Sequence, residues 1–261
     1  MRYEVLGSLR ITAGERTATV RAAKPETVLA TLLARSDEVV TTDQLCTELW
    51  GESPPRRFNA ALHVYISRLR KLLGDLRGGG ENPIVTHTSG YVLKLGPDRL
   101  DALDFRRLLE QGRERARRGE LEAAVDTLER ATALWRGPAL ENLQNGPIVS
   151  VFAGQLDEQR LGCAQLSADC RLRLGWYREA AEQLQELVKQ YPYHEVFCWQ
   201  LMLALGCSGR RADAIKAYHA IRDVLDRDLG LEPCRAVNAL HQAILIDEPV
   251  PDVSELVYDG S

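Results

Sequence analysis

The sequence has no long hydrophobic run, and its longest apolar stretches are only a few residues. A membrane-spanning helix needs about 20 consecutive apolar residues, so we expect no membrane span and no membrane partner. The first residues, MRYEVLGSLRI, also lack the apolar block of a secretory signal peptide. These two absences predict that the protein works in the cytoplasm.

The cysteines and histidines lack the spacings of a metal or redox site, since there is no C-x-x-C and no H-x-x-x-H pair. The phosphate-binding pattern G-x-x-x-x-G-K-[ST] and a nucleophile elbow are missing too. Paired carboxylates such as Asp226 and Asp228 lie in a helical charged run, where solvation explains them. We therefore expect core thiols, no cofactor and no enzymatic activity.

Basic residues are slightly outnumbered by acidic ones, and the formal net charge of the chain is -4. The two kinds of charge are unevenly distributed along the chain. Residues 1–100 hold 14 Lys and Arg against 11 Asp and Glu, a net charge of +3. The remaining residues hold 19 against 26, a net charge of -7. A mildly basic front and an acidic back indicate two domains with different partners.

The first hundred residues alternate short strand-like and helical segments. YEVLGSLRI and ATVRA predict strands, and KPETVLATLLARS predicts an amphipathic helix. TTDQLCTELWG predicts a second helix, because Thr41 and Gln44 stand at the spacing of a capping box. A basic helix then runs to about Leu73, and IVTHTSGYVLKL predicts a β-hairpin with its turn at Ser89-Gly90. This order of elements is that of a winged helix-turn-helix.

From Leu100 onward the pattern is helical only, and part of it repeats. GWYREAAEQLQEL begins at Gly175 and GRRADAIKAYHAI begins at Gly209, an offset of 34 residues, which matches Leu184 with Tyr218. This is the length of a tetratricopeptide repeat, a helix pair that stacks on its neighbours. GELEAAVDTL fits the same local pattern but not the spacing. The second half is therefore predicted to be a helical repeat domain.

The fold class expected from these patterns is mainly α with small β elements. Residues 1–98 would form a winged helix-turn-helix domain, which we expect to fold on its own. Residues 99–246 would form an all-α, tetratricopeptide-like domain, and residues 247–261 an acidic tail.

The segment RRFNAALHVYISRLRK, residues 56–71, has no acidic residue and five cations: Arg56, Arg57, Arg68, Arg70 and Lys71. As a helix it places one apolar stripe toward a core, formed by Leu62, Ile66, Leu69 and Leu73. A neighbouring polar stripe is formed by Asn59, His63, Ser67 and Arg70, extended by Arg68 and Lys71. Such groups can bond to base edges and phosphates, so this face predicts contact with double-stranded DNA. A merely solvated basic face is the alternative.

Two neighbouring segments extend the predicted DNA contact. The N-terminus of the capped helix, with Thr41, Thr42 and Gln44, would lie near a phosphate, because free N–H groups and the helix dipole favour anions there. The hairpin tip would reach an adjacent groove or the backbone through Thr88, Ser89 and Tyr91.

Several stretches resemble a known family. VLGSLRI, KPETVLATLLARSDEVVTTDQLCTELWG and VYISRLRKLLG resemble the OmpR-type DNA-binding domain of the Streptomyces antibiotic regulatory protein (SARP) family. ALWRGPALENL, DEQRL and WQLMLALGCSGRRADAIKAYHAIRDVLDRDLGLEP resemble that family's bacterial transcriptional activation domain. The resemblance covers residues 1 to about 246, with both halves in the expected order.

The resemblance implies a transcriptional activator of a gene cluster for a secondary metabolite such as an antibiotic. It implies direct-repeat sites near promoters, protomers side by side on DNA, and contact with RNA polymerase subunits including a sigma factor. The recognition helix would be residues 57–73 and the wing residues 84–95. The DNA-facing segment of that helix would hold Tyr65, Ser67, Arg68, Arg70 and Lys71. The assignment of Asn59 and His63 to the DNA-contacting face depends on the helical periodicity alone.

Two other classes of function stay open at the level of sequence. One is a helical-repeat scaffold that binds a protein, with the winged domain as an adaptor. The acid-free basic helix argues against this reading, and a salt-dependent DNA-binding assay would separate the two. The other is an enzyme, for which the sequence offers no motif.

Overall fold

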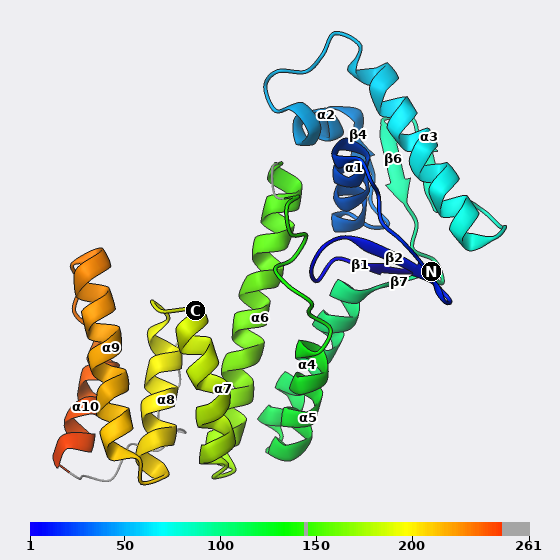
Figure 1. Cartoon of the computed structure of the whole chain (residues 1–261). Coiled ribbons are helices and arrows are strands. Elements are labelled where there is room, and N and C mark those ends of the chain that lie inside the picture. The colour runs from blue at the N-terminus through cyan, green and yellow to red at the C-terminus, as the bar shows by residue number, and fades with distance from the viewer. Residues whose placement is uncertain (144–145, 247–261) are drawn as a thin grey trace. The chain divides into compact units, whose positions relative to one another are not determined.

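The computed structural model describes residues 1–143 and 146–246, so the predicted acidic tail at residues 247–261 lies outside the described residues (Figure 1). The chain divides into two compact units. The first contains Met1–Leu109 and Arg130–Leu161, and the second contains Glu110–Glu129 and the chain from Gly162 onward. Among the described helices, none combines the length and the apolar character needed to cross a bilayer.

The first unit begins with a small sheet of short strands. Its order is β3-β2-β1-β7, with β1 antiparallel to β2 and parallel to β7. The bounds are β1 Arg2–Glu4, β2 Arg10–Ala13, β3 Arg16–Ala18 and β7 Arg99–Leu100. The sequence-based boundary at residues 98 and 99 stays a prediction, and β7, directly after it, pairs with β1.

Helices and a second sheet follow in the order predicted for a winged helix-turn-helix (Figure 1). The bounds are α1 Ala23–Ala34, β4 Val40–Thr41, α2 Thr42–Trp50, α3 Phe58–Arg77, β5 Ile84–His87 and β6 Gly90–Leu93. The second sheet has the order β4-β6-β5. The predicted capping box is confirmed, because Thr41 and Gln44 each accept a hydrogen bond from the other's backbone N–H.

The turn of the β-hairpin is one residue earlier than predicted. His87 pairs with Gly90, so the turn residues are Thr88 and Ser89. Gly90 belongs to β6, where a Cβ atom would collide with the backbone carbonyl of Val40 on the neighbouring strand. Close approach between strands therefore explains this glycine, and the turn does not need it.

The apolar stripe predicted for α3 is confirmed. Leu62, Ile66, Leu69 and Leu73 are each at most 2% exposed. Burying a leucine or isoleucine side chain contributes roughly 1.5–3 kcal/mol, so these four residues fix which face of α3 is turned outward.

The first unit continues beyond β7 into α4 and the beginning of α6. Asp101, fully buried at the start of α4, accepts hydrogen bonds from the N–H groups of Val5 (2.8 Å) and Leu6 (3.2 Å). In return, the carbonyls of Leu6 and Val5 accept from the N–H groups of Arg136 (2.8 Å) and Leu140 (2.9 Å). Both backbone groups of these two residues therefore depend on chain beyond residue 98.

A second connection joins α2 to the first turn of α6. The carboxylate of Glu48 is 4% exposed and accepts hydrogen bonds from the N–H groups of Ile148 and Val149 (3.4 Å for the latter). Burial raises the pKa of Glu48, and the two backbone donors lower it. Glu48 thus caps a helix that begins a hundred residues later in the chain.

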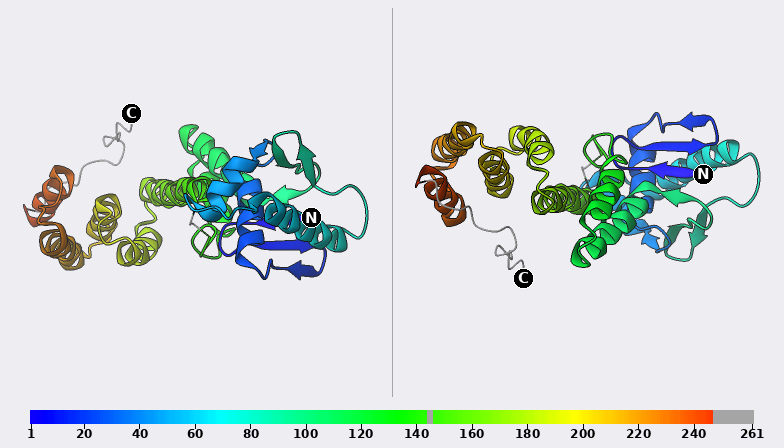
Figure 2. Two further views of the ribbon diagram at one scale, coloured as in Figure 1. Left: turned by 90° about the horizontal axis from the view of Figure 1, so that it is seen from above. Right: turned by 90° about the horizontal axis from the view of Figure 1, so that it is seen from below.

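Further helices make up the rest of the described chain. Their bounds are α4 Asp101–Arg117, α5 Leu121–Thr132, α6 Pro147–Arg173, α7 Tyr177–Gln190, α8 Glu195–Cys207, α9 Arg211–Leu229 and α10 Arg235–Ile246. Within the second unit, α7 to α10, coloured yellow to red, lie side by side in chain order in both views of Figure 2. Gly175 and Gly209, which begin the two repeats, both have a positive φ and lie just before α7 and α9.

Candidate nucleic-acid interface

The outward face of α3 carries most of the side chains predicted to contact DNA. Asn59, His63, Ser67, Arg68 and Lys71 are all exposed, on the side of the helix away from the core. The structure thus brings together both the residues expected from helical periodicity and most of those implied by the family resemblance.

Val64 also lies on the outward face of α3, although its hydrophobic side chain suggested burial. Its side chain is 47% exposed, whereas Leu62 and Ile66 beside it in the sequence are buried. Helical geometry explains the difference, because residues two apart point in nearly opposite directions. Exposed methyl groups on such a helix can contact the methyl group of thymine. Helical position, rather than hydrophobicity, was the signal that could have identified Val64.

Four cations have no acidic partner on this surface. Within the described part of the chain, Arg56, Arg57, Arg68 and Lys71 form no ion pair and no side-chain hydrogen bond. All four are exposed, and we call them the basic face. Because no carboxylate neutralises it, the basic face is available for phosphate groups.

Arg70 occupies a different place from the one predicted. Its Nε donates to the carbonyl of Ile84 at 3.1 Å, and a terminal nitrogen donates to Oγ1 of Thr86 at 2.7 Å. The Asn82 side chain in turn donates to the carbonyl of Arg70 at 2.7 Å. The guanidinium therefore joins α3 to strand β5. Arg70 thereby links the helix to the hairpin, and its direct contact with DNA stays a prediction.

Tyr91 is also turned inward. It was predicted at the hairpin tip, but it lies on β6, in register with Val40, and is 6% exposed. Burial raises the pKa of its hydroxyl, and the positive charge of Arg70 lowers it. All four residues of β6 are buried, because β6 is the middle strand between β4 and β5. Tyr91 therefore supports the sheet, and its contact with a groove stays a prediction.

Tyr65 packs against aromatic neighbours instead of projecting freely. Its ring stacks on Trp50 at the end of α2, with ring centres 6.3 Å apart, and Phe58 meets the same ring edge-on at 6.5 Å. The ammonium group of Lys24 lies 4.5 Å from the Trp50 ring centre. This aromatic cluster fixes α2 against the first turns of α3. Tyr65 thereby positions the helix on which the basic face lies.

The N-terminus of α2 is less open to an anion than predicted. The capping box supplies acceptors for the N–H groups of Thr41 and Gln44, and the N–H of Thr42 donates to the carbonyl of Ser89 at 3.0 Å. Asp43 adds a negative charge to the first turn. Among the backbone donors of this turn in the described structure, the N–H of Asp43 is the one left for an anion, beside the side-chain hydroxyl of Thr42.

The same contact brings two predicted segments together. Thr42, at the start of α2, meets the hairpin turn, whose Thr88 and Ser89 are exposed. The imidazole Nδ1 of His87 lies 3.2 Å from Oγ of Ser89 and holds the turn from within. The hairpin turn and the helix N-terminus therefore form one polar surface.

The described residues contain no group of three or more His, Cys, Asp or Glu side chains that could hold a metal ion. The expectation of core thiols holds for Cys46, Cys163, Cys170 and Cys198, which are buried. It is wrong for Cys207 and Cys234, which are exposed. Their places at the end of α8 and just before α10 explain this, because neither lies on a helix face that packs.

Two protein families match the chain. The family described as "Transcriptional regulatory protein, C terminal" matches residues 19–93, and the "Bacterial transcriptional activator domain" matches residues 100–245. The order is the one that the resemblance implied, and the second match alone covers more than half of the chain.

Individual relatives agree with the family matches. Regulatory protein DnrI of Streptomyces peucetius is 33% identical, over 95% of this chain and 93% of its own. Transcriptional regulator RedD of Streptomyces coelicolor is 33% identical, over 97% of this chain and 73% of its own. The solved structure of Mycobacterium tuberculosis EmbR, in complex with a low-affinity phosphopeptide, superposes with a TM-score of 0.87 at 31% identity. That superposition covers 97% of this chain and 67% of EmbR.

These matches confirm the predicted fold class, a winged helix-turn-helix followed by a helical activator domain. They also confirm that the chain is a regulator of transcription and not an enzyme. Transcriptional regulators of this type bind DNA. The chain therefore belongs to the Streptomyces antibiotic regulatory protein family of transcriptional activators.

Proposed function

We propose that this protein activates a secondary-metabolite gene cluster by reading promoter DNA with the outward face of α3. The observation that carries the proposal is the basic face, four exposed cations without an acidic partner among the described residues. An unneutralised basic surface on a helix that also presents amide, imidazole and hydroxyl groups fits the major groove better than it fits solvent.

We assign distinct parts of the contact to distinct side chains. Arg68, Asn59, His63 and Ser67 would reach base edges, with Val64 offering a methyl contact. Arg56, Arg57 and Lys71 would meet phosphates and set affinity rather than specificity. Thr88 and Ser89 at the hairpin turn, with Thr42 beside them, would meet the adjacent backbone. Arg70, Tyr65 and Tyr91 would hold these elements in position.

The helical half would supply activation. Residues 101–261 carry a net charge of -7, so this half is suited to a basic protein surface rather than to DNA phosphates. Stacked helix pairs offer an extended surface for a second protein. We infer that the partner is RNA polymerase, including its sigma factor, and that two protomers stand side by side on direct repeats about one helical turn of DNA apart.

The test is to recover the genomic fragments that the protein retains and to footprint it on them. The Arg68→Ala/Lys71→Ala variant should lose the footprint, while Arg118→Ala, an exposed arginine paired with Glu114, should keep it. Footprinted promoters should contain direct repeats and should be transcribed more strongly in vitro when the protein is added. Equal footprints for both variants would favour the helical-repeat scaffold instead.

A further inference from the structure

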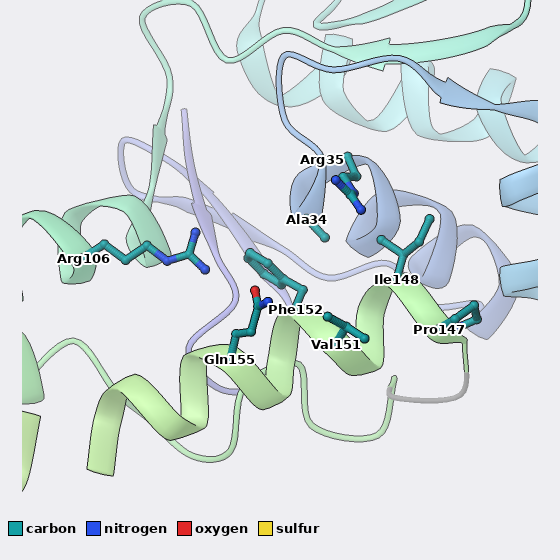
Figure 3. A pocket seen from close by; sticks show the side chains of 8 residues that line it. All are labelled: Ala34, Arg35, Arg106, Pro147, Ile148, Val151, Phe152 and Gln155. Carbon is teal, nitrogen blue, oxygen red and sulfur yellow. The ribbon is translucent and has the colours of Figure 1, made fainter. Parts of the chain in front are cut away.

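A cavity of about 390 Å³ lies within the first unit, away from the basic face (Figure 3). It is bounded by the end of α1, the first half of α4 and the first turns of α6. Ile148, Val151 and Phe152 give it apolar walls, and Arg35, Arg106 and Gln155 supply polar groups. This volume falls within the range of small-molecule sites, which combine apolar walls with a few convergent polar groups.

The charge of the cavity has one sign. Its lining contains two guanidinium groups and no carboxylate. Arg35 approaches Glu38 at 3.4 Å, but both side chains are largely exposed, so this pair is weak. An anion entering the cavity would therefore meet one guanidinium, that of Arg106, that no described carboxylate neutralises.

Arg106 is oriented toward the cavity without an acidic partner. Its Nε donates to the side-chain oxygen of Gln159 at 3.1 Å, and its guanidinium lies 5.5 Å from the ring centre of Phe152. Partial burial lowers its pKa. Among the described residues, its two terminal nitrogens meet no acceptor. A partly buried guanidinium held at one nitrogen and free at the others is ready to bind a carboxylate with both.

The start of α6 does not compete for the anion. Glu48 already accepts from the N–H groups of Ile148 and Val149. The free-donor chemistry that usually draws anions to a helix N-terminus is therefore satisfied from within the protein. The remaining positive groups of the cavity are the two arginines.

We propose that this cavity binds a small organic carboxylate. The carboxylate pairs with the terminal nitrogens of Arg106, and an aliphatic or aromatic body covers Phe152 and Val151. A compact hydrated anion such as phosphate would leave the apolar walls uncovered. Because Ile148 both lines the cavity and donates to Glu48, the ligand touches the turn of α6 that α2 holds.

The probe we would use is 4-phenylbutyrate, an aromatic carboxylate, titrated into the full chain by calorimetry or NMR. Its neutral amide, 4-phenylbutyramide, has the same body without the charge. We expect the acid to bind, and both the amide and the Arg106→Gln variant to weaken binding at least about tenfold, as expected for the loss of a charge-assisted pair.

Two further variants complete the test. Arg107→Gln is the matched control, since Arg107 neighbours Arg106 on α4 but is exposed and pairs with Asp104. It should bind the acid as the natural protein does. Val151→Asp places a carboxylate in the lining at a side chain that is 60% exposed, so the variant should fold and should repel the ligand. Val151→Asp decides the matter if Arg106→Gln unfolds.

Several results would overturn the proposal. They are no binding of the acid, equal binding of acid and amide, equal affinities of Arg106→Gln and Arg107→Gln, or unchanged binding by Val151→Asp. Tighter binding of inorganic phosphate than of the acid would also overturn it, because the apolar walls would then contribute nothing.

Discussion

The basic face and helix α4 both carry several exposed cations, yet they use them in opposite ways. On α4, Arg107 lies 3.1 Å from Asp104, Arg113 lies 3.6 Å from Glu110, and Arg117 lies 2.9 Å from Glu114. On the basic face, no described acid lies within ion-pairing distance of a cation. The comparison teaches that pairing, rather than the number of cations, distinguishes a surface for a charged partner from one that is merely solvated.

The largest effect should come from removing part of the basic face. We expect Arg68→Ala/Lys71→Ala to weaken specific DNA binding by about 2–4 kcal/mol, because one base contact and one phosphate contact disappear. The salt dependence should become shallower by about one unit of slope for the lost phosphate contact. Electrophoretic mobility shifts at several salt concentrations measure both quantities.

The matched variant on the other helix is Arg113→Ala/Arg117→Ala, which removes the same number of exposed cations from α4. Its DNA affinity and salt slope should match those of the natural protein. If the two double variants weaken binding equally, the distinction between paired and unpaired arginines is wrong.

A smaller effect is expected where a charge is buried and fully hydrogen-bonded. Asp101→Asn should lower the free energy of unfolding by about 1–3 kcal/mol, because an amide cannot accept from both Val5 and Leu6 with the strength of a carboxylate. Glu110 lies on the same helix with a side chain that is 62% exposed. Glu110→Gln should therefore change the free energy of unfolding by at most about 0.5 kcal/mol. Urea denaturation measures both, and equal effects would contradict the role given to Asp101.

Next comes a half-buried acid, Asp169. Burial raises the pKa of Asp169 to about 6, although a hydrogen bond from Gln200 and the charge of Arg173 lower it. A folded pKa above the unfolded one means that this group destabilises the fold progressively as pH rises from about 4 to about 6.

We therefore expect Asp169→Asn to raise the free energy of unfolding at pH 7 by roughly 1–2 kcal/mol, with the gain fading below about pH 4. Urea denaturation of both proteins at a series of pH values provides the measurement. A gain that is the same at pH 3.5 and pH 7 would show that the effect has another origin.

The smallest effect belongs to the surface pairs of α4. Arg117→Ala should change the free energy of unfolding by less than about 0.5 kcal/mol, since exposed ion pairs contribute little. Thermal unfolding followed by circular dichroism is sufficient to see this. A loss above about 1 kcal/mol would mean that the pairs of α4 act as a cooperative network.

Local patterns in the sequence predicted the elements around the interface correctly. The spacing of Leu62, Ile66, Leu69 and Leu73 fixed the buried stripe of α3, and the Thr41–Gln44 spacing identified the capping box. Both signals lie within a few residues of the structure they specify, which is why one sequence is enough to read them.

The roles that sequence reasoning missed depend on partners farther along the chain. The link from Arg70 to β5 has no signal in the sequence, because its acceptors are 14 and 16 residues away and leave no helical pattern. Tyr91 was placed at a hairpin tip because the turn was read one residue late. Helical periodicity cannot show what a neighbouring strand accepts, so these two assignments needed the fold.

The structure shows a loss of stability that a fragment of residues 1–98 would suffer and that the sequence does not reveal. Such a fragment lacks Asp101, Arg136 and Leu140, which satisfy the backbone groups of Val5 and Leu6. Each buried group left without a partner costs about 1–3 kcal/mol. A fragment extended to residue 161 keeps all of these partners.

The hydrogen bonds that Glu48 accepts from the start of α6 also bear on how such regulators can be recombined. A chimera that takes residues 1–98 from one relative and the activator domain from another joins two chains that never shared this cap. If the relative that supplies residues 1–98 lacks an acid at the position of Glu48, the N–H groups in the first turn of α6 have no acceptor in a buried place. Grafting that one carboxylate together with the α6 turn it serves is therefore the simplest rule for building functional hybrids of this family.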